Sequence, residues 1–241
     1  EEFTLITTID GLMDRLVPLD LIRKNCIHLS YDDTIDVEEL KTALVNSGFE
    51  RTEQVETAGQ FAVRGGIIDI FPMTGDVPYR IELWDDVIDS IRSFDALSQR
   101  TIENIDDIVI YPASEYILSQ EEIARGIEKI REEASLREKT LRESFHTEEA
   151  HRLSVCINEF TERLSISRTG VFLDSFMTYF YPETMTLPDY FPAEETIFFI
   201  DEPGRIEERA NTVETEFRES MINRIEGGYM LSGQTGVFCD T

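Results

Sequence analysis

The sequence has little of what several protein classes require. Its three cysteines, Cys26, Cys156 and Cys239, are far apart and odd in number, so they form neither a disulfide framework nor a paired metal motif. This usage favours a reducing compartment, and we expect a cytoplasmic protein. No apolar run approaches the roughly 18 residues that a membrane-spanning helix needs, so we expect no membrane partner. The chain opens on Glu1-Glu2-Phe3 without a methionine or signal peptide, and we interpret it as a fragment of something longer.

Basic side chains are also scarce. The 241 residues carry 22 Lys and Arg against 49 Asp and Glu, a net charge of −27. A surface with this balance repels phosphate backbones, which excludes a basic nucleic-acid clamp. The acidity serves solubility or a surface for a basic partner, and both interpretations stay open. With 41% hydrophobic residues, the chain has enough apolar matter to bury a core in one or two domains.

The common catalytic motifs are missing. No glycine is followed by Lys and Ser or Thr in the P-loop pattern whose backbone N–H groups hold nucleotide phosphates. No GxSxG motif occurs. The histidines His28, His146 and His151 have no zinc-binding spacing. These absences argue against a self-contained enzyme and predict no cofactor and no metal in this chain.

One segment resembles half of an ATPase site. Residues 196–200 form a continuous apolar run, which predicts a strand buried on both faces of a parallel sheet. Asp201 and Glu202 follow it, as in a Walker B position where the acid would hold Mg²⁺. The alternative, which we favour, is that strand ends are exposed and often acidic.

Residues 26–115 read as an α+β module. Asp36 and Glu39 form a capping box, and the apolar positions that follow share one helix face up to a C-cap at Gly48. Around this helix, apolar residues alternate with polar ones, a spacing of two that is typical of strands. Short connections between the expected strands favour antiparallel pairing. The expected strands are 27–31, 49–55, 61–64, 67–71, 79–84, 88–94 and 108–111.

The flanking segments predict mainly helices. Residues 4–9 read as a short strand and residues 10–16 as a helical turn or two. Two helices are expected within 121–163, with a break near His146, and a charged helix over 202–225 ends at two glycines. An aromatic stretch between them predicts core packing by Phe172, Phe176, Tyr179 and Phe180.

Three phrases in the module are distinctive. They are GQFAVRGGIIDIFP at 59–72, PYRIELWDD at 78–86 and SIRSFDALSQR at 90–100. Together they resemble the UvrB-homology module that the excision-repair protein UvrB shares with the bacterial transcription-repair coupling factors (Mfd). The SQRT phrase, with FYPETM at 180–185 and FFIDEP at 198–203, is more similar to the coupling factors.

The resemblance implies a layout. Residues 1–25 would end the first segment of a helicase-like domain 1, a Rossmann-like α/β fold derived from P-loop NTPases. Residues 26–115 would be an inserted α+β domain 2, and 116–241 would complete domain 1. The degenerate P-loop position would precede Glu1. The motor domains with their ATP and Mg²⁺, which make the parent an ATP-dependent DNA translocase, and the RNA-polymerase-binding and DNA-tracking parts would follow Thr241.

The resemblance also implies a partner site. In this family domain 2 docks onto UvrA through residues that match Arg64, Arg80 and Trp84. The family usually has Phe at the last position, so Trp84 keeps an aromatic anchor but changes its size. Glu82 and Asp85 are supporting candidates.

Strand periodicity is compatible with that site. Arg80, Glu82 and Trp84 alternate along one strand and are expected on one face, with apolar residues on the other. An exposed Arg and Trp would make an interface hot spot. In the alternative interpretation, Trp84 caps the edge of the core and Arg80 pairs with Glu82 or Asp85.

Three functional hypotheses follow. The first is a non-catalytic adaptor that recruits UvrA to stalled RNA polymerase for nucleotide excision repair. The second is part of a UvrB-like ATP-dependent DNA-damage-processing protein with nucleotide and DNA binding of its own. The third is a regulated form of the first, in which another domain of the parent masks the UvrA-binding face.

Overall fold

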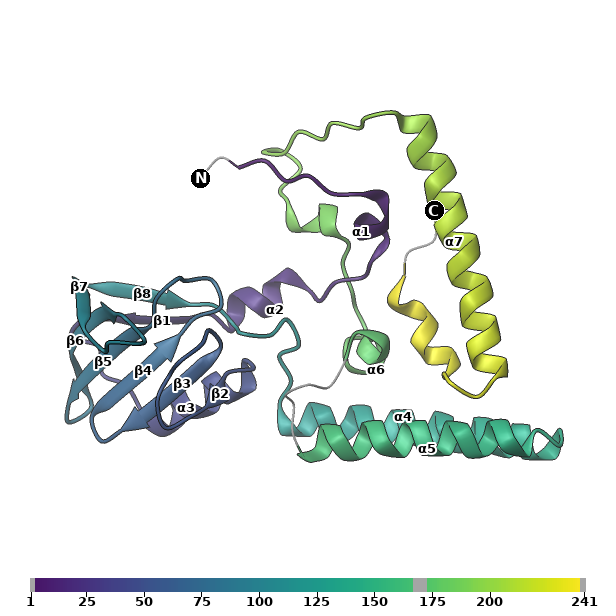
Figure 1. Ribbon diagram of the computed structural model, residues 1–241, viewed down its shortest axis with the longest axis horizontal. Helices are drawn as coiled ribbons and strands as arrows, with labels where there is room; N and C mark the ends of the chain where they lie inside the picture. Colours follow the sequence, from purple (N-terminus) through teal and green to yellow (C-terminus); the bar gives the residue numbers. More distant parts are fainter. Residues whose placement is uncertain (1–2, 167–172, 239–241) are drawn as a thin grey trace. The chain divides into compact units, whose positions relative to one another are not determined.

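The computed structural model describes residues 3–166 and 173–238 and divides into two compact units. We call residues 19–119 the sheet unit, and residues 1–18 with 120–241 the helical unit. Among the described residues, no helix is long and apolar enough to cross a membrane. The expected mixed class of helices with antiparallel sheets is seen (Figure 1), whereas Phe172 and Cys239 lie outside the described residues.

The sheet unit contains a six-stranded sheet whose strands follow one another in chain order. All neighbours pair antiparallel except β2 with β3, which are parallel. A separate antiparallel pair joins β1 to β8. The elements are α2 (Leu19–Lys24), β1 (Ile27–Ser30), α3 (Val37–Asn46), β2 (Glu50–Arg51), β3 (Gln60–Arg64), β4 (Ile67–Phe71), β5 (Tyr79–Trp84), β6 (Val87–Phe94), β7 (Thr101–Ile105) and β8 (Asp107–Ile110).

Three details of this sheet differ from the expectation. The strand expected over 49–55 is only the two residues of β2, and it runs parallel to β3 because an eight-residue connection brings the chain back beside it. Strand β7 was not predicted, because its residues are almost all exposed and give no alternating apolar signal. Helix α2 was also not predicted, and it buries no residue fully.

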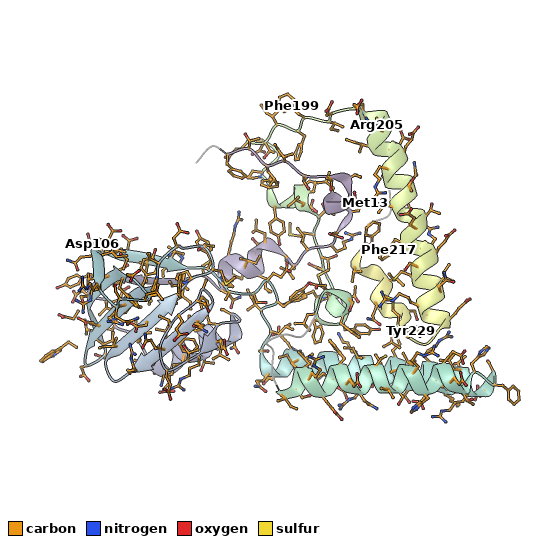
Figure 2. All side chains as sticks on the ribbon, viewed as in Figure 1. Met13, Asp106, Phe199, Arg205, Phe217 and Tyr229 are labelled. Atoms are coloured by element: carbon orange, nitrogen blue, oxygen red, sulfur yellow. The ribbon has the colours of Figure 1, made fainter. Side chains whose placement is uncertain are left out.

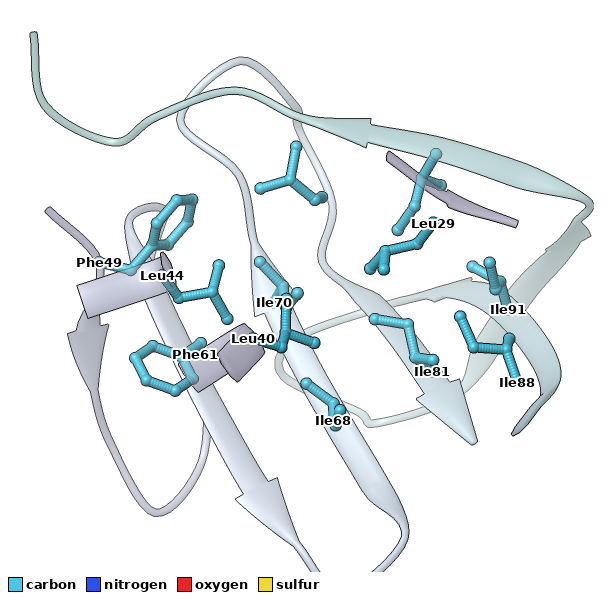
Figure 3. Close-up of a cluster of buried hydrophobic side chains, with 12 residues drawn as sticks. Leu29, Leu40, Leu44, Phe49, Phe61, Ile68, Ile70, Ile81, Ile88 and Ile91 are labelled. Atoms are coloured by element: carbon cyan, nitrogen blue, oxygen red, sulfur yellow. The ribbon is translucent and has the colours of Figure 1, made fainter. Parts of the chain in front are cut away.

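The core of the sheet unit lies between α3 and the sheet (Figure 3). Asp36 caps α3 as predicted, because its carboxylate accepts hydrogen bonds from the backbone N–H groups of Glu38 and Glu39 at 2.8 and 3.0 Å. Leu40 and Leu44 then bury the predicted apolar face. The other buried members of this cluster are Leu29, Phe49, Phe61, Ile68, Ile70, Ile81, Ile88, Ile91, Ile108 and Ile110.

The helical unit is built on a long helical hairpin. Helices α4 (Gln120–Glu143) and α5 (Thr147–Ile166) lie side by side with the predicted break between them (Figure 1). The short helix α6 (Met177–Phe180) packs on α4, and Phe176 and Tyr179 join the core as predicted, while Phe180 is partly buried. The remaining elements are α1 (Ile9–Met13), η1 (Asp174–Phe176), η2 (Leu187–Tyr190), α7 (Pro203–Glu226) and η3 (Ser232–Val237).

The two strands predicted for the helical unit are wrong. Residues 4–8 have no regular structure, and residues 196–200 have none either. Ile197 and Phe199 are 80% and 92% exposed, and Figure 2 shows Phe199 on the extended segment that leads to α7. A strand buried on both faces needs neighbouring strands. All named strands of the described residues belong to the sheet unit, so this apolar run has no ladder to join.

Candidate partner-binding surface

The candidate residues come from strands β3 and β5 and from the turn after β5, and β4 lies between these two strands in the sheet. Across the sheet, Asp69 of β4 lies opposite Ala62 of β3 on one side and Arg80 of β5 on the other. Along β5, Ile81 is fully buried in the core beneath α3, so Arg80 and Glu82 are on the opposite face, as the alternation predicts. We call this opposite face of the sheet the outer face.

A buried carboxylate organises the outer face. The Asp69 side chain is only 1% exposed. Its Oδ1 accepts a hydrogen bond from Arg80 Nε at 2.7 Å, and its Oδ2 accepts from Arg80 Nη2 at 2.8 Å and from Arg64 Nη2 at 2.5 Å. The contact with Arg80 is therefore a two-point fork, the strongest arrangement of this ion pair. The cost of burying the charge is offset because two cations face it.

Arg80 is engaged inside the unit. Its Nη2 also donates to Gln99 Oε1 at 2.8 Å, and its guanidinium carbon lies 4.4 Å from the centre of the Phe94 ring. The side chain is 17% exposed. The hydrogen bond to Asp69 raises the pKa of Arg80, so its charge is permanent. The alternative pairing of Arg80 with Glu82 or Asp85 is wrong, because the hydrogen-bonding carboxylate is Asp69, directly across from it on β4.

The two supporting candidates do different things. Glu82 accepts hydrogen bonds from Arg92 and from Ser90 Oγ, both on β6. Asp85 occupies the tight turn between β5 and β6 with a φ of 60°. Neither residue hydrogen-bonds Arg64 or Arg80 in the described structure.

Trp84 and Arg64 are the accessible members of the candidate set. Trp84 ends β5 opposite Val87, beside that two-residue turn, and is 80% exposed. It therefore does not cap the edge of the core, which contradicts the alternative interpretation. The Arg64 side chain is 44% exposed and also donates to the backbone carbonyl of Glu53 at 3.3 Å. The outer face thus presents one free indole, one half-exposed guanidinium and one largely enclosed guanidinium.

Sequence reasoning missed Asp69 and Gln99. Asp69 did leave a signal, because a single carboxylate within an isoleucine-rich strand is rarely buried unless it is paired. Gln99 gave no such signal in the sequence, because its contact with Arg80 depends on the path of the connection between β6 and β7.

The Walker B-like pair does not follow a strand, so the half of an ATPase site that it resembles is not formed. Asp201 and Glu202 follow a segment without regular structure, and Glu202 pairs with the exposed Arg205 at 2.6 Å. The described residues contain no group of three His, Cys, Asp or Glu side chains arranged to hold a metal ion.

Comparison with known proteins defines the class of the sheet unit. A model of the UvrB interaction domain family matches residues 27–116, which covers every strand of the unit and the outer face. This segment is a UvrB interaction domain.

Most of the chain is also similar to much longer proteins. It is 35% identical to the transcription-repair-coupling factor of Bacillus subtilis (strain 168) over 94% of its own length and 19% of that protein. It is 34% identical to the transcription-repair-coupling factor of Staphylococcus haemolyticus (strain JCSC1435) over 95% and 19%. The chain is therefore similar to transcription-repair-coupling factors along almost its whole length, and it spans about a fifth of the length of these curated relatives.

Proposed function

We propose that the sheet unit is a non-catalytic docking module for UvrA, and that the exposed indole of Trp84 is its central contact. In this role it serves a coupling factor that recruits UvrA to stalled RNA polymerase for nucleotide excision repair. The match to a UvrB interaction domain supports the partner. The observation that carries the contact is the 80% exposure of the only tryptophan in the chain, at the tip of a hairpin that lies at the same end of the sheet as the half-exposed Arg64.

The physical argument is that folding of the unit does not explain a tryptophan at position 84. A tryptophan left in water forgoes a large hydrophobic gain, and Trp and Arg are the residue types most often found as interface hot spots. The indole does not cover the core, because it is 80% exposed while Ile81 and Ile88 are fully buried in the cluster that includes residues of α3. Arg64 adds an accessible cation to a chain whose net charge is −27, which suits a partner surface with oxygen acceptors around an apolar pocket.

The rest of the layout completes the proposal. Residues 1–25 and 116–241 would belong to a helicase-like domain 1 into which residues 26–115 are inserted. RNA polymerase and DNA contacts, and ATP hydrolysis, would come from other parts of the coupling factor. Another of its domains would mask the outer face until the factor is active.

The direct test is titration of UvrA with the wild-type chain and with Trp84→Ala. We expect the substitution to weaken binding about thirtyfold, the equivalent of ~2 kcal/mol for a hot-spot residue, with an unchanged unfolding midpoint. Because the chain has one tryptophan, labelling it with 5-fluorotryptophan gives a single ¹⁹F resonance that shifts when UvrA covers the indole.

A matched control is Tyr111→Ala, which removes a half-exposed aromatic residue that follows β8 in the same unit. It should leave the affinity unchanged. Trp84→Phe, the residue usual in the family, should retain most of the binding. If Trp84→Ala and Arg64→Ala both bind like the wild type, the outer face is not the docking site.

A further inference from the structure

We infer that Gln99 is a positioning residue that, together with Asp69, holds the Arg80 guanidinium so that only its Nη1 edge is offered to UvrA. This inference deepens the proposed function and rests on it. Gln99 belongs to the connection between β6 and β7, which bends back toward β5, and was not among the residues that the sequence suggested.

The hydrogen-bond inventory of Arg80 defines its orientation. A guanidinium has five N–H groups. Nε and one N–H of Nη2 point at Asp69, and the other N–H of Nη2 points at Gln99. The ring of Phe94 covers one face. Nη1 has no hydrogen bond to any described residue and is not among their buried unpaired atoms, so its two N–H groups remain for an incoming oxygen acceptor.

Gln99 is itself held firmly. Its Nε2 donates to the Ala96 carbonyl at 2.7 Å, and its backbone N–H donates to the Asp95 carbonyl at 2.8 Å. Its φ is 59°, in the left-handed region that glycine adopts without strain. In this conformation the Gln99 side-chain amide makes two contacts at once: it donates to the Ala96 carbonyl within the connection and accepts from Arg80. Glycine would fit the backbone but would provide neither hydrogen bond.

The two contacts of the Gln99 amide can be separated. Gln99→Ala removes both the donor to Ala96 and the acceptor for Arg80. Gln99→Glu removes the donor but keeps an oxygen acceptor for Arg80. In both variants Asp69 still binds Arg80 by its fork, so the buried charge stays paired and the unit stays folded.

The experiment measures UvrA affinity and the urea unfolding midpoint for these variants. We expect Gln99→Ala to bind about tenfold more weakly at an unchanged midpoint, because the guanidinium loses one of its restraints. Gln99→Glu should restore affinity to within about threefold of the wild type. If Gln99→Glu binds as weakly as Gln99→Ala, Gln99 acts only on the shape of the connection and the inference is overturned.

A double-mutant cycle tests whether the effect passes through Arg80. Arg80→Lys keeps a cation beside Asp69 but loses the planar fork. In that background, Gln99→Ala should cause no further loss, whereas a fully additive loss would overturn the inference. Gln54→Ala is the matched control, because Gln54 is an exposed glutamine of the same unit whose side chain has no hydrogen bond to the described residues.

The results separate the inference from the proposed function. If Trp84→Ala weakens binding and Gln99→Ala does not, the outer face binds UvrA but Gln99 does not position Arg80. If neither Trp84→Ala nor Arg64→Ala has an effect, the docking site lies elsewhere and both fail.

Discussion

Asp69 shows how one side chain determines what its neighbours can do. It is buried in β4 between Ile68 and Ile70, and it binds both arginines that the family resemblance assigns to the partner. Arg80 therefore neutralises a buried carboxylate within the sheet unit, in addition to any contact with UvrA. A loss of binding in Arg80→Ala alone would not distinguish the two, because that variant also leaves a buried carboxylate short of a partner.

At this scale we predict that Asp69→Ala strongly destabilises the sheet unit. The substitution leaves two guanidiniums close together without their shared anion, and removing one partner of a buried ion pair costs about 3–5 kcal/mol. Urea unfolding of the chain, followed by circular dichroism, measures the free energy of unfolding.

The control for this prediction is Asp89→Ala. Asp89 is an exposed carboxylate of β6 without a hydrogen bond or ion pair to the described residues, and its removal should change stability by no more than about 0.5 kcal/mol. Equal and small effects of the two substitutions would contradict the role given to Asp69.

At the scale of elements, one residue of α4 is explained by a contact with another helix and not by helix propensity. Gly126 lies inside α4 and is buried. A Cβ atom there would overlap the ring of Phe180, which belongs to α6. The glycine is therefore the position at which α6 approaches α4 closely enough to pack.

We predict that Gly126→Ala destabilises the helical unit, although alanine favours an isolated helix by ~1 kcal/mol. The overlap with Phe180, which should cost about 1–3 kcal/mol, should outweigh that gain and produce a net loss of up to about 2 kcal/mol. Thermal and urea unfolding of the chain measure the change.

Two comparisons make this prediction specific. Gly204→Ala, in the first turn of α7 where a Cβ meets no atom within 4 Å, should be neutral or stabilising. In a Phe180→Ala background, Gly126→Ala should lose most of its cost. A stabilising Gly126→Ala in the wild-type chain would show that α6 does not pack there.

At the scale of the whole molecule, the chain consists of two units with separate cores. The sheet unit is one continuous segment, residues 19–119, and the twelve buried members of its main cluster all lie within it. The helical unit combines two segments of the chain, and its main cluster includes residues from α4, α5 and α6. A continuous segment with its own core meets the requirement for independent folding.

We therefore predict that residues 19–119 fold alone and bind UvrA with an affinity within about threefold of that of the whole chain. Dispersed amide resonances would show the fold, and the ¹⁹F signal of labelled Trp84 would report binding. A folded segment that fails to bind UvrA, when the whole chain binds, would place part of the docking site in the helical unit.

Predictability followed the range of the interactions. The N-cap of α3, the central hairpins and the break between α4 and α5 were predicted, because capping and periodicity act within a few residues. The prediction of a buried strand at residues 196–200 was wrong, because an apolar run can form such a strand only where neighbouring strands pair with it, and the run itself does not show whether they exist. Strand β7 was missed for the opposite reason. It is a strand because it pairs with β6, and its own residues show no alternation of apolar and polar side chains.

By itself, the sequence determined the family, the mixed class of the fold and the alternation that sends Arg80 and Ile81 to opposite faces, because motifs and side-chain periodicity are properties of a short stretch of chain. Only the tertiary structure decided that Arg80 is bound inward by Asp69 and Gln99 while Trp84 stays in water. Those outcomes depend on strand register and on a connection that folds back, which join residues 11 and 19 positions apart along the chain.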